Sequence, residues 1–146
     1  MTLGGTMPGP CLLCGERRGI RHADGWHCGV CTWRCGDVPD SDLPRPRVDI
    51  VYYIRFADRV KIGTSHKPRQ RLTALWHDEL LAFERGDRTL ERVRHEQFAD
   101  LREGGEWFTA APRLLEHAAR LAGGGDPWHA YARWVSAAFA RLSTAR

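Results

Sequence analysis

The sequence predicts an α+β protein built on a small antiparallel three-stranded sheet flanked by helices. The run Asp49–Arg55 is dense in β-branched and aromatic residues, and the run Arg59–Thr64 alternates polar and apolar residues. Residues 56–58 separate these two runs, which is a hairpin-length connection. The apolar run Asp78–Arg85 is too short for a typical helix, so it predicts the third strand.

Helices are predicted on either side of the third strand. The first runs from about Lys67 to Trp76, directly after the hairpin. The second follows Asp87, whose side chain suits a helix cap, and extends to about Leu101 with apolar residues at helical spacing. Together with the strands, these helices define an expected domain from residue 49 to residue 111.

A helical C-terminal extension is predicted for residues 112–146. Pro112 begins its first helix, the glycines 123–125 interrupt it, and Asp126 with Pro127 begins the second. Apolar residues follow helical spacing in both segments, so each helix has a face to bury. We expect this helical hairpin to pack on the 49–111 domain. Dimerisation and a clamp beside DNA are the alternatives.

The five cysteines all lie between residues 11 and 35, which predicts a metal site. Cys11 and Cys14 form one Cys-x-x-Cys pair, and Cys28 and Cys31 form another. Two such pairs place four thiolates tetrahedrally around zinc. Clustered cysteines in a chain without a secretion signal favour a metal over disulfides. Residues 11–36 are therefore expected to form a zinc-ribbon-like knuckle segment.

The exact zinc ligands stay open at this stage. Cys35 is a fifth cysteine that can replace Cys31, and His22 or His27 can replace a thiolate. The segment has too few apolar residues for a core of its own, so metal binding would supply its folding energy. Four thiolates leave no open coordination position, which predicts a structural zinc rather than a catalytic one.

Charge and hydropathy exclude several classes of protein. The net charge of the 146 residues is +4, and neither residues 1–48, with six basic and five acidic side chains, nor the remainder forms a polybasic tail. Any affinity for nucleic acid must therefore come from local clustering. No apolar run is long enough to span a bilayer and no signal peptide is visible, so we expect a cytoplasmic protein without membrane association.

Two further segments are expected to lack regular structure. Residues 1–10 are rich in Gly, Pro and Thr, which predicts disorder. Residues 37–48 contain three prolines and three aspartates, which predicts a semi-extended linker before the sheet.

The hairpin and the helix after it are unusually basic around a single acid, Asp58. The basic side chains are Arg55, Arg59, Lys61, Lys67, Arg69 and Arg71. One interpretation is a solvated basic face. The other is that the strand tyrosines, the strand lysine and the helix arginine converge at one edge to handle phosphate.

Short motifs follow one another in this domain at fixed distances. They are Ile50-Val51-Tyr52 with Ile54, Lys61-Ile62-Gly63, Arg71 eight residues after Gly63, Glu91, and Gly105-Glu106-Trp107-Phe108. In this order they resemble the GIY-YIG nuclease superfamily over residues 49 to 111. The resemblance is greatest to the small phage-type branch, which carries Lys-Ile-Gly and a Gly-Glu-Trp-Phe ending. Lys61 stands where most of the superfamily has tyrosine.

The resemblance implies a metal-dependent DNA endonuclease, a hydrolase of phosphodiester bonds. Tyr52 would be the general base, with Lys61 and Arg71 lowering its pKa and Arg71 also stabilising charge on the phosphate. Glu91 would hold a magnesium or manganese ion. His95, one turn later, would orient Glu91 or hydrogen-bond the leaving group.

DNA is the implied partner, and the phosphate contacts are expected from basic side chains around the hairpin. These are Arg55, Arg59, Lys67 and Arg69. Tyr53 is expected on the other face of the sheet because side chains alternate along a strand. Glu106 has two open roles: it can orient Arg71 or add a carboxylate to the metal.

Two other functions are compatible with the sequence. One is a non-catalytic DNA-binding module in which the zinc segment and the basic hairpin grip DNA. The other is a zinc-stapled adaptor for protein interactions. The presence of Tyr52, Arg71 and Glu91 together favours the nuclease.

Overall fold

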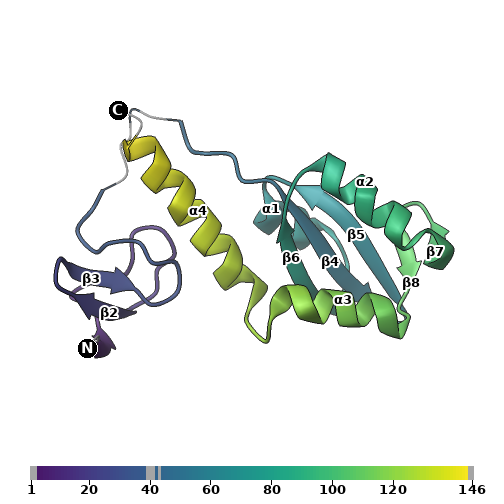
Figure 1. Ribbon diagram of the computed structural model, residues 1–146, viewed down its shortest axis with the longest axis horizontal. Coiled ribbons are helices and arrows are strands. Elements are labelled where there is room, and N and C mark those ends of the chain that lie inside the picture. Colours follow the sequence, from purple (N-terminus) through teal and green to yellow (C-terminus); the bar gives the residue numbers. More distant parts are fainter. Residues whose placement is uncertain (1–2, 39–41, 43, 145–146) are drawn as a thin grey trace. The chain divides into compact units, whose positions relative to one another are not determined.

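A computed structural model describes residues 3–38, 42 and 44–144 of the chain (Figure 1). These residues form an α+β structure with four α-helices, a three-stranded sheet and a five-stranded sheet, both antiparallel. The chain divides into two compact units. The cysteine unit comprises Met1–Arg47 and Trp128–Arg146, and the sheet unit comprises Val48–Pro127.

The five-stranded sheet has the strand order β6-β4-β5-β8-β7. Its strands are β4 (Ile50–Phe56), β5 (Arg59–Ser65), β6 (Glu79–Arg85), β7 (Arg102–Gly104) and β8 (Trp107–Thr109). The three predicted strands are all present, but the sheet has five strands and not the three that were predicted. The additional hairpin, β7 and β8, adds to the outer edge of β5. Its strands have three residues each, which is too short to show an alternating pattern.

The register of β4 and β5 separates the two tyrosines. Tyr52 lies opposite Gly63, and Tyr53 lies opposite Ile62. Directly paired residues share a face and neighbours along a strand alternate, so the tyrosines point to opposite faces. Tyr53 joins the main hydrophobic core together with Ile62.

Helices cover both faces of this sheet. They are α1 (Pro68–Ala74), α2 (Arg88–Gln97) and α3 (Pro112–Ala122), with a short 3-10 turn at Ala99–Leu101. Phe98 and Leu114 pack into the core on the Tyr53 face, and Figure 1 shows α3 in front of the sheet and α1 behind it. The side chain of Asp87 accepts a hydrogen bond from the Thr89 N–H at 2.9 Å, which confirms the predicted cap of α2.

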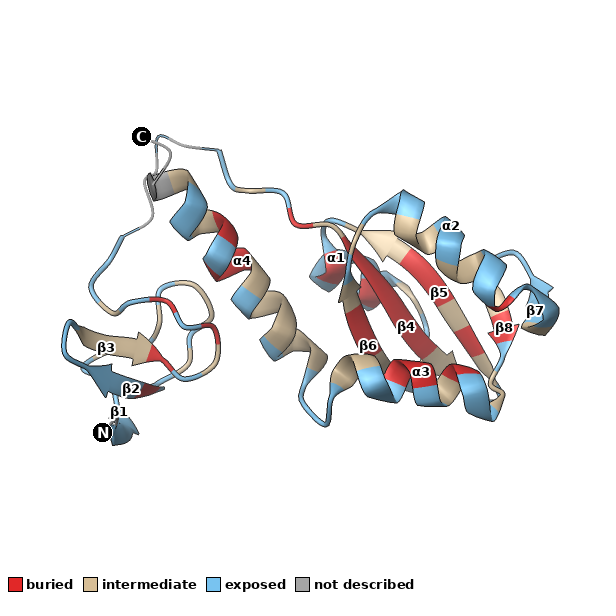
Figure 2. Ribbon diagram, viewed as in Figure 1, coloured by how far each residue is buried: buried red, intermediate tan, exposed pale blue. Residues whose placement is uncertain are grey.

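The predicted first helix was too long at its C-terminal end. The structure ends α1 at Ala74, where Leu75 already has extended backbone angles. The side chain of Trp76 is 81% exposed, so it does not join the core. Figure 2 shows the buried residues concentrated along β4, β5 and β6.

The cysteine unit contains β1 (Leu3–Thr6), β2 (Arg18–His22), β3 (Gly25–Cys28) and α4 (Pro127–Thr144). The prediction of disorder for residues 1–10 was wrong for residues 3–6, because β1 pairs with β2 along its whole length. A Cβ atom on Gly5 would lie 3.1 Å from the Trp26 ring, so glycine lets this ring lie close to the strand. The predicted linker, 37–48, includes residues 39–41 and 43, which lie outside the described residues.

The predicted C-terminal extension is divided between the two units. Gly123 ends α3 in the left-handed region, with φ of 59°. Whereas α3 packs on the sheet, α4 packs on the cysteine segment, where the ring centroids of Phe139 and Trp33 lie 6.2 Å apart. Among the described residues, no helix combines the length and the apolar character needed to cross a membrane.

We predict that Gly63→Ala destabilises the sheet unit by about 1–3 kcal/mol, because the new methyl group overpacks the site. Its Cβ atom would lie 2.3 Å from the Tyr52 hydroxyl oxygen and 2.5 Å from the ring carbon that carries it. Gly104→Ala is the control, since a Cβ atom there meets no atom within 4 Å. Urea unfolding of both variants measures the effect. Equal losses of stability would contradict this account of Gly63.

Candidate functional site

A group of polar side chains gathers around Tyr52 in the sheet unit, and we call it the Tyr52 cluster. Its members are Tyr52, Lys61, Arg71, Glu91, His95 and Glu106, and mutual electrostatic or hydrogen-bonding contacts link them. They come from β4, β5, α1, α2 and the turn between β7 and β8. Segments far apart in the sequence therefore supply one cluster.

The Tyr52 hydroxyl is buried and makes no hydrogen bond of normal geometry with the described residues. Burial raises the pKa of this phenol, and the negative charges of Glu106 and Glu91 raise it further. The Arg71 guanidinium is close enough to act in the opposite direction, and the pKa of Arg71 is itself raised by Tyr52. The net pKa of Tyr52 is raised, so the nearby cations do not ionise it by themselves.

Beyond the end of β8, two members of the Tyr52 cluster hydrogen-bond the backbone of β5. β8 pairs with β5 only as far as Lys61. At the next residue, the Ile62 N–H donates to the Glu106 carbonyl at 3.0 Å, and the Ile62 carbonyl accepts from His95 Nε2 at 2.8 Å. These two bonds fasten the β7–β8 turn and α2 to the strand. Since His95 Nε2 donates to the backbone, this nitrogen positions α2.

Two carboxylates lie together at this edge. Burial raises the pKa of Glu91, and the neighbouring Glu106 carboxylate raises it further. Lys61 Nζ lies 3.8 Å from Glu106 Oε2, and His95 Nε2 lies 3.8 Å from Glu91 Oε1. A pair of part-buried carboxylates in contact is poised to take up a proton or a cation.

The four basic residues expected to contact DNA do not share one face. Arg55 pairs with Val60 in the register, so it lies on the face opposite to Tyr52, and its Nε donates to the Ala57 carbonyl at 2.8 Å. The Arg59 guanidinium lies 4.9 Å from the centre of the Trp107 ring. The remaining two, Lys67 and Arg69, are exposed at the start of α1.

The four predicted zinc ligands come together in the cysteine unit. The sulfur atoms of Cys11, Cys14, Cys28 and Cys31 all lie within 4.8 Å of one another. The Cys11–Cys31 and Cys14–Cys28 sulfur pairs are each 3.5 Å apart. The N–H groups of Val30 and Cys31 both point at Cys28 Sγ at 3.4 Å. This arrangement of four thiols can hold a metal ion.

The alternative ligands lie outside this group. The His27 ring bonds to Asp24 at 3.0 Å, and the His22 ring packs against His27 at 4.6 Å between centroids. Cys35 is a free cysteine that does not belong to the four-sulfur group. Burial raises the pKa of Cys14 to about 11, and the hydrogen bond with Cys28 also raises it.

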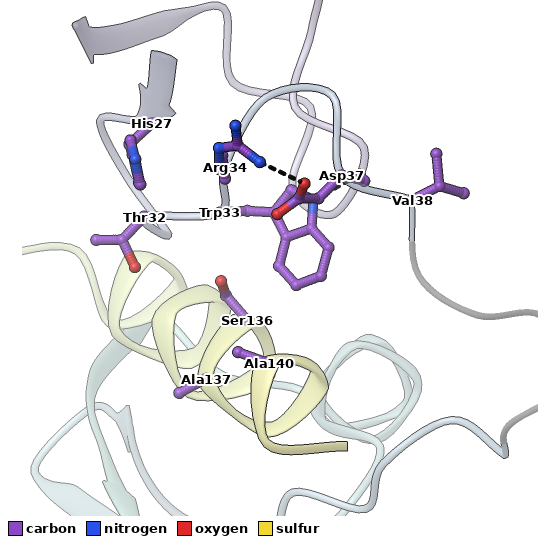
Figure 3. A pocket seen from close by; sticks show the side chains of 9 residues that line it. All are labelled: His27, Thr32, Trp33, Arg34, Asp37, Val38, Ser136, Ala137 and Ala140. Carbon is purple, nitrogen blue, oxygen red and sulfur yellow. Dashed lines mark hydrogen bonds and ion pairs between the residues drawn. The ribbon is translucent and has the colours of Figure 1, made fainter. Parts of the chain in front are cut away.

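A groove of about 590 Å³ lies between the loop after β3 and α4 in the cysteine unit (Figure 3). Trp33 forms part of its wall, and Ser136 and Ala137 of α4 face it. Arg34 donates to Asp37 at 3.1 Å beside the groove, which neutralises this arginine. The groove therefore lies between the loop after β3 and α4, and the charge of Arg34 beside it is paired.

A second polar network lies on the Tyr53 face, and no sequence pattern indicated it. The Tyr53 hydroxyl donates to Glu84 at 3.0 Å and lies 3.2 Å from His117 Nε2. Arg94 binds both carboxylate oxygens of Glu84. Although burial opposes ionisation, the hydrogen bonds from Arg94 and Tyr53 hold the pKa of Glu84 below its usual value. The network ties α2 and α3 to β4 and β6.

Searches of protein-family models, curated proteins and solved structures found no match to this chain. The functional argument therefore depends on the motifs and on the geometry of the Tyr52 cluster. Within that cluster, the contacts of Glu106 with Lys61 and Glu91 could not be read from the sequence, because they depend on where the β7–β8 turn meets β5.

We predict that the sheet unit loses stability as the pH falls below about 6.5, because His117 is held neutral in the fold. Burial lowers the pKa of His117 from 6.5, and the Arg94 charge lowers it further. The unfolded chain then binds a proton that the folded chain does not, so this stability is present above pH 6.5 and is lost toward the folded pKa.

Urea unfolding between about pH 5 and pH 7.5 measures this loss. His117→Gln keeps an N–H donor for Tyr53 without the titrating ring, and it is expected to flatten the dependence in this range. His66→Gln, at an exposed position, is the control. A slope that survives in His117→Gln would assign the loss to other groups.

Proposed function

We propose that the sheet unit is a metal-dependent DNA endonuclease of the GIY-YIG type, which hydrolyses phosphodiester bonds. One observation carries this proposal: Tyr52, Arg71 and Glu91, the three residues that the motifs single out, meet in one cluster. The buried Tyr52 hydroxyl makes no hydrogen bond of normal geometry with the described residues, whereas buried hydroxyls are normally satisfied. A bound water or phosphate oxygen would satisfy it.

Tyr52 would act as the general base on the attacking water, and Arg71 would contact the scissile phosphate. A guanidinium aimed at a phosphate stabilises the charge that grows in the transition state. Lys61 lies on the same sheet face as Tyr52, because it pairs with Ile54 two residues along β4. Its side chain is 15% exposed and it adds a second positive charge next to the phosphate position.

The donor set around Glu91 fits a hard divalent cation. Its carboxylate is 13% exposed and receives no hydrogen bond from an N–H group of the described residues. Oxygen ligands suit magnesium or manganese rather than a softer metal. Bound there, the ion would supply positive charge to the leaving oxygen and would offset the carboxylates that raise the pKa of Tyr52.

His95 supports the site through position. Its Nε2–H is used by the Ile62 carbonyl, and its ring packs 5.1 Å from the Phe108 ring. It holds α2 against β5, and this contact positions Glu91, which lies one turn earlier in the same helix. A role in protonating the leaving group would require this bond to break, so we assign His95 as a positioning residue.

The four-cysteine group fits zinc. Tetrahedral zinc with Zn–S bonds of about 2.3 Å separates its sulfur ligands by about 3.8 Å. Two of the observed separations are 3.5 Å, and all of them lie within 4.8 Å, so the four sulfur atoms surround a space of the right size for the ion. Four thiolates fill the coordination sphere, so this zinc would be structural, and reduced thiols of this kind suit the cytoplasm.

The charge distribution supports DNA as the partner and also favours a second candidate function. The cysteine unit carries nine basic and five acidic residues, whereas the sheet unit carries thirteen of each. The net charge of +4 therefore belongs to the cysteine unit. This unit would anchor DNA while the sheet unit cuts, or the whole chain would be a non-catalytic DNA-binding module.

We predict that the purified protein contains about one zinc ion per chain and that Cys31→Ser loses it. Cys35→Ser is the matched control and should keep the zinc, because its sulfur lies outside the four-sulfur group. Elemental analysis measures the zinc content, and circular dichroism reports the accompanying loss of structure. Loss of zinc in Cys35→Ser alone would reverse the ligand assignment.

We predict that Arg71→Ala and Glu91→Ala each lower the rate of DNA nicking by about a hundredfold or more, with smaller changes in affinity. Arg71 acts on charge that develops in the transition state, and Glu91 repels phosphate until the ion is bound. Nicking and gel-shift assays on the same DNA, with magnesium, manganese or a chelator, measure both quantities. Arg120→Ala and Glu116→Ala, exposed on α3, are the controls.

Two results would contradict the nuclease proposal. Wild-type protein that binds DNA but never cuts it with either metal would favour the DNA-binding module. A Glu91→Ala variant that cuts like wild type would contradict the residue assignment even in a working nuclease.

A further inference from the structure

We propose that Glu106 is a second carboxylate ligand of the divalent ion, paired with Glu91. The inference rests on the proposed function for the location of the ion, and it decides between the two roles that the sequence left open for Glu106. The ion would then have two protein ligands, one from α2 and one from the β7–β8 turn, instead of a single glutamate.

The first observation is that the two carboxylates face each other without adequate partners. They are in contact, and the Glu91 and Glu106 side chains are 13% and 38% exposed. The two carboxyl groups lie within hydrogen-bonding reach of each other, so a shared proton can link them. Lys61 stands 3.8 Å from Glu106, which is beyond hydrogen-bond distance. Two part-buried carboxylates in contact are costly unless a proton or a cation lies between them, and a divalent ion can take the place of the proton.

The second observation is the Tyr52 hydroxyl. It is buried and makes no hydrogen bond of normal geometry with the described residues, and both carboxylates are close enough to raise its pKa. A hydrated divalent ion held by the two carboxylates would bring water molecules to this hydroxyl. Magnesium and manganese keep several waters when proteins bind them through one or two carboxylates.

The third observation is that contacts with the β5 backbone position the two segments that carry the carboxylates. The Glu106 carbonyl accepts from the Ile62 N–H at 3.0 Å, and Gly105 before it has φ of 56°, which shapes the turn. On the other side, His95 bonds the Ile62 carbonyl and sets the position of α2. Both anchors act on the same residue of β5, so the spacing of the acids is preorganised.

The test is a manganese titration of the zinc-loaded, full-length protein, followed by electron paramagnetic resonance of free Mn²⁺. Wild type is expected to bind one Mn²⁺, and Glu106→Gln and Glu91→Gln are each expected to weaken binding by about tenfold or more. Glu103→Gln, exposed three residues earlier in β7, is the control and should bind as wild type. Wild-type affinity in Glu106→Gln would overturn the inference.

A second variant tests the same idea in the opposite direction and does not depend on the folding of Glu106→Gln. Lys61→Met removes the cation that competes for Glu106, so it should tighten Mn²⁺ binding by about threefold or more. Unchanged or weaker binding in Lys61→Met would overturn the inference. A purely structural Glu106 would change the unfolding temperature without changing either Mn²⁺ affinity.

Cleavage assays separate this inference from the proposed function. If wild type binds Mn²⁺ through both glutamates but never cuts DNA, the shared ion site stands and the nuclease proposal fails. If wild type cuts DNA while Glu106→Gln keeps its Mn²⁺ affinity, the nuclease proposal stands and the role of Glu106 fails.

Discussion

The pairing of Tyr52 with Gly63 is the constraint on which the sheet unit depends. The tyrosine side chain lies over a strand residue that has no Cβ atom, and any larger residue there would collide with the phenol. This close approach buries the hydroxyl on the α1 face, within reach of Arg71. The same register sends Tyr53 to the other face, where a tyrosine is used for packing and structural hydrogen bonds.

The two faces treat their ionisable groups in opposite ways. On the Tyr53 face, the Glu84 carboxylate has two hydrogen bonds from one guanidinium and one from a phenol, so its charge is satisfied within the fold. In the Tyr52 cluster, two carboxylates contact each other, and the phenol makes no hydrogen bond of normal geometry with the described residues. The Glu84 carboxylate is thus fully hydrogen-bonded, whereas the Tyr52 hydroxyl is not. Polar groups that lack partners in an otherwise well-packed fold are typical of functional sites.

The sequence predicted the strands, the helices and the four clustered cysteines because local patterns specify them: alternation in β5, helical spacing after Asp87, and two Cys-x-x-Cys pairs. It failed where tertiary contacts decide the structure. β1 is a glycine strand stabilised by backbone pairing, and α4 packs on the cysteine segment more than a hundred residues earlier in sequence. The position of Glu106 depends in the same way on where a short hairpin meets β5.

The division of the chain follows from this packing of α4. Trp33 and Cys31 are buried in a small core to which Phe139 and Ala132 contribute, so the first and last segments of the chain share one folding unit. A metal ion on the four cysteines would therefore stabilise the helix as well as the knuckles, since a core this small has little apolar area of its own. The sheet unit has its own hydrophobic core, so the Tyr52 cluster does not depend on that ion for its position. In the proposed function, a metal at the cysteines and a metal at the carboxylates would therefore act on different units, the first through folding and the second through chemistry.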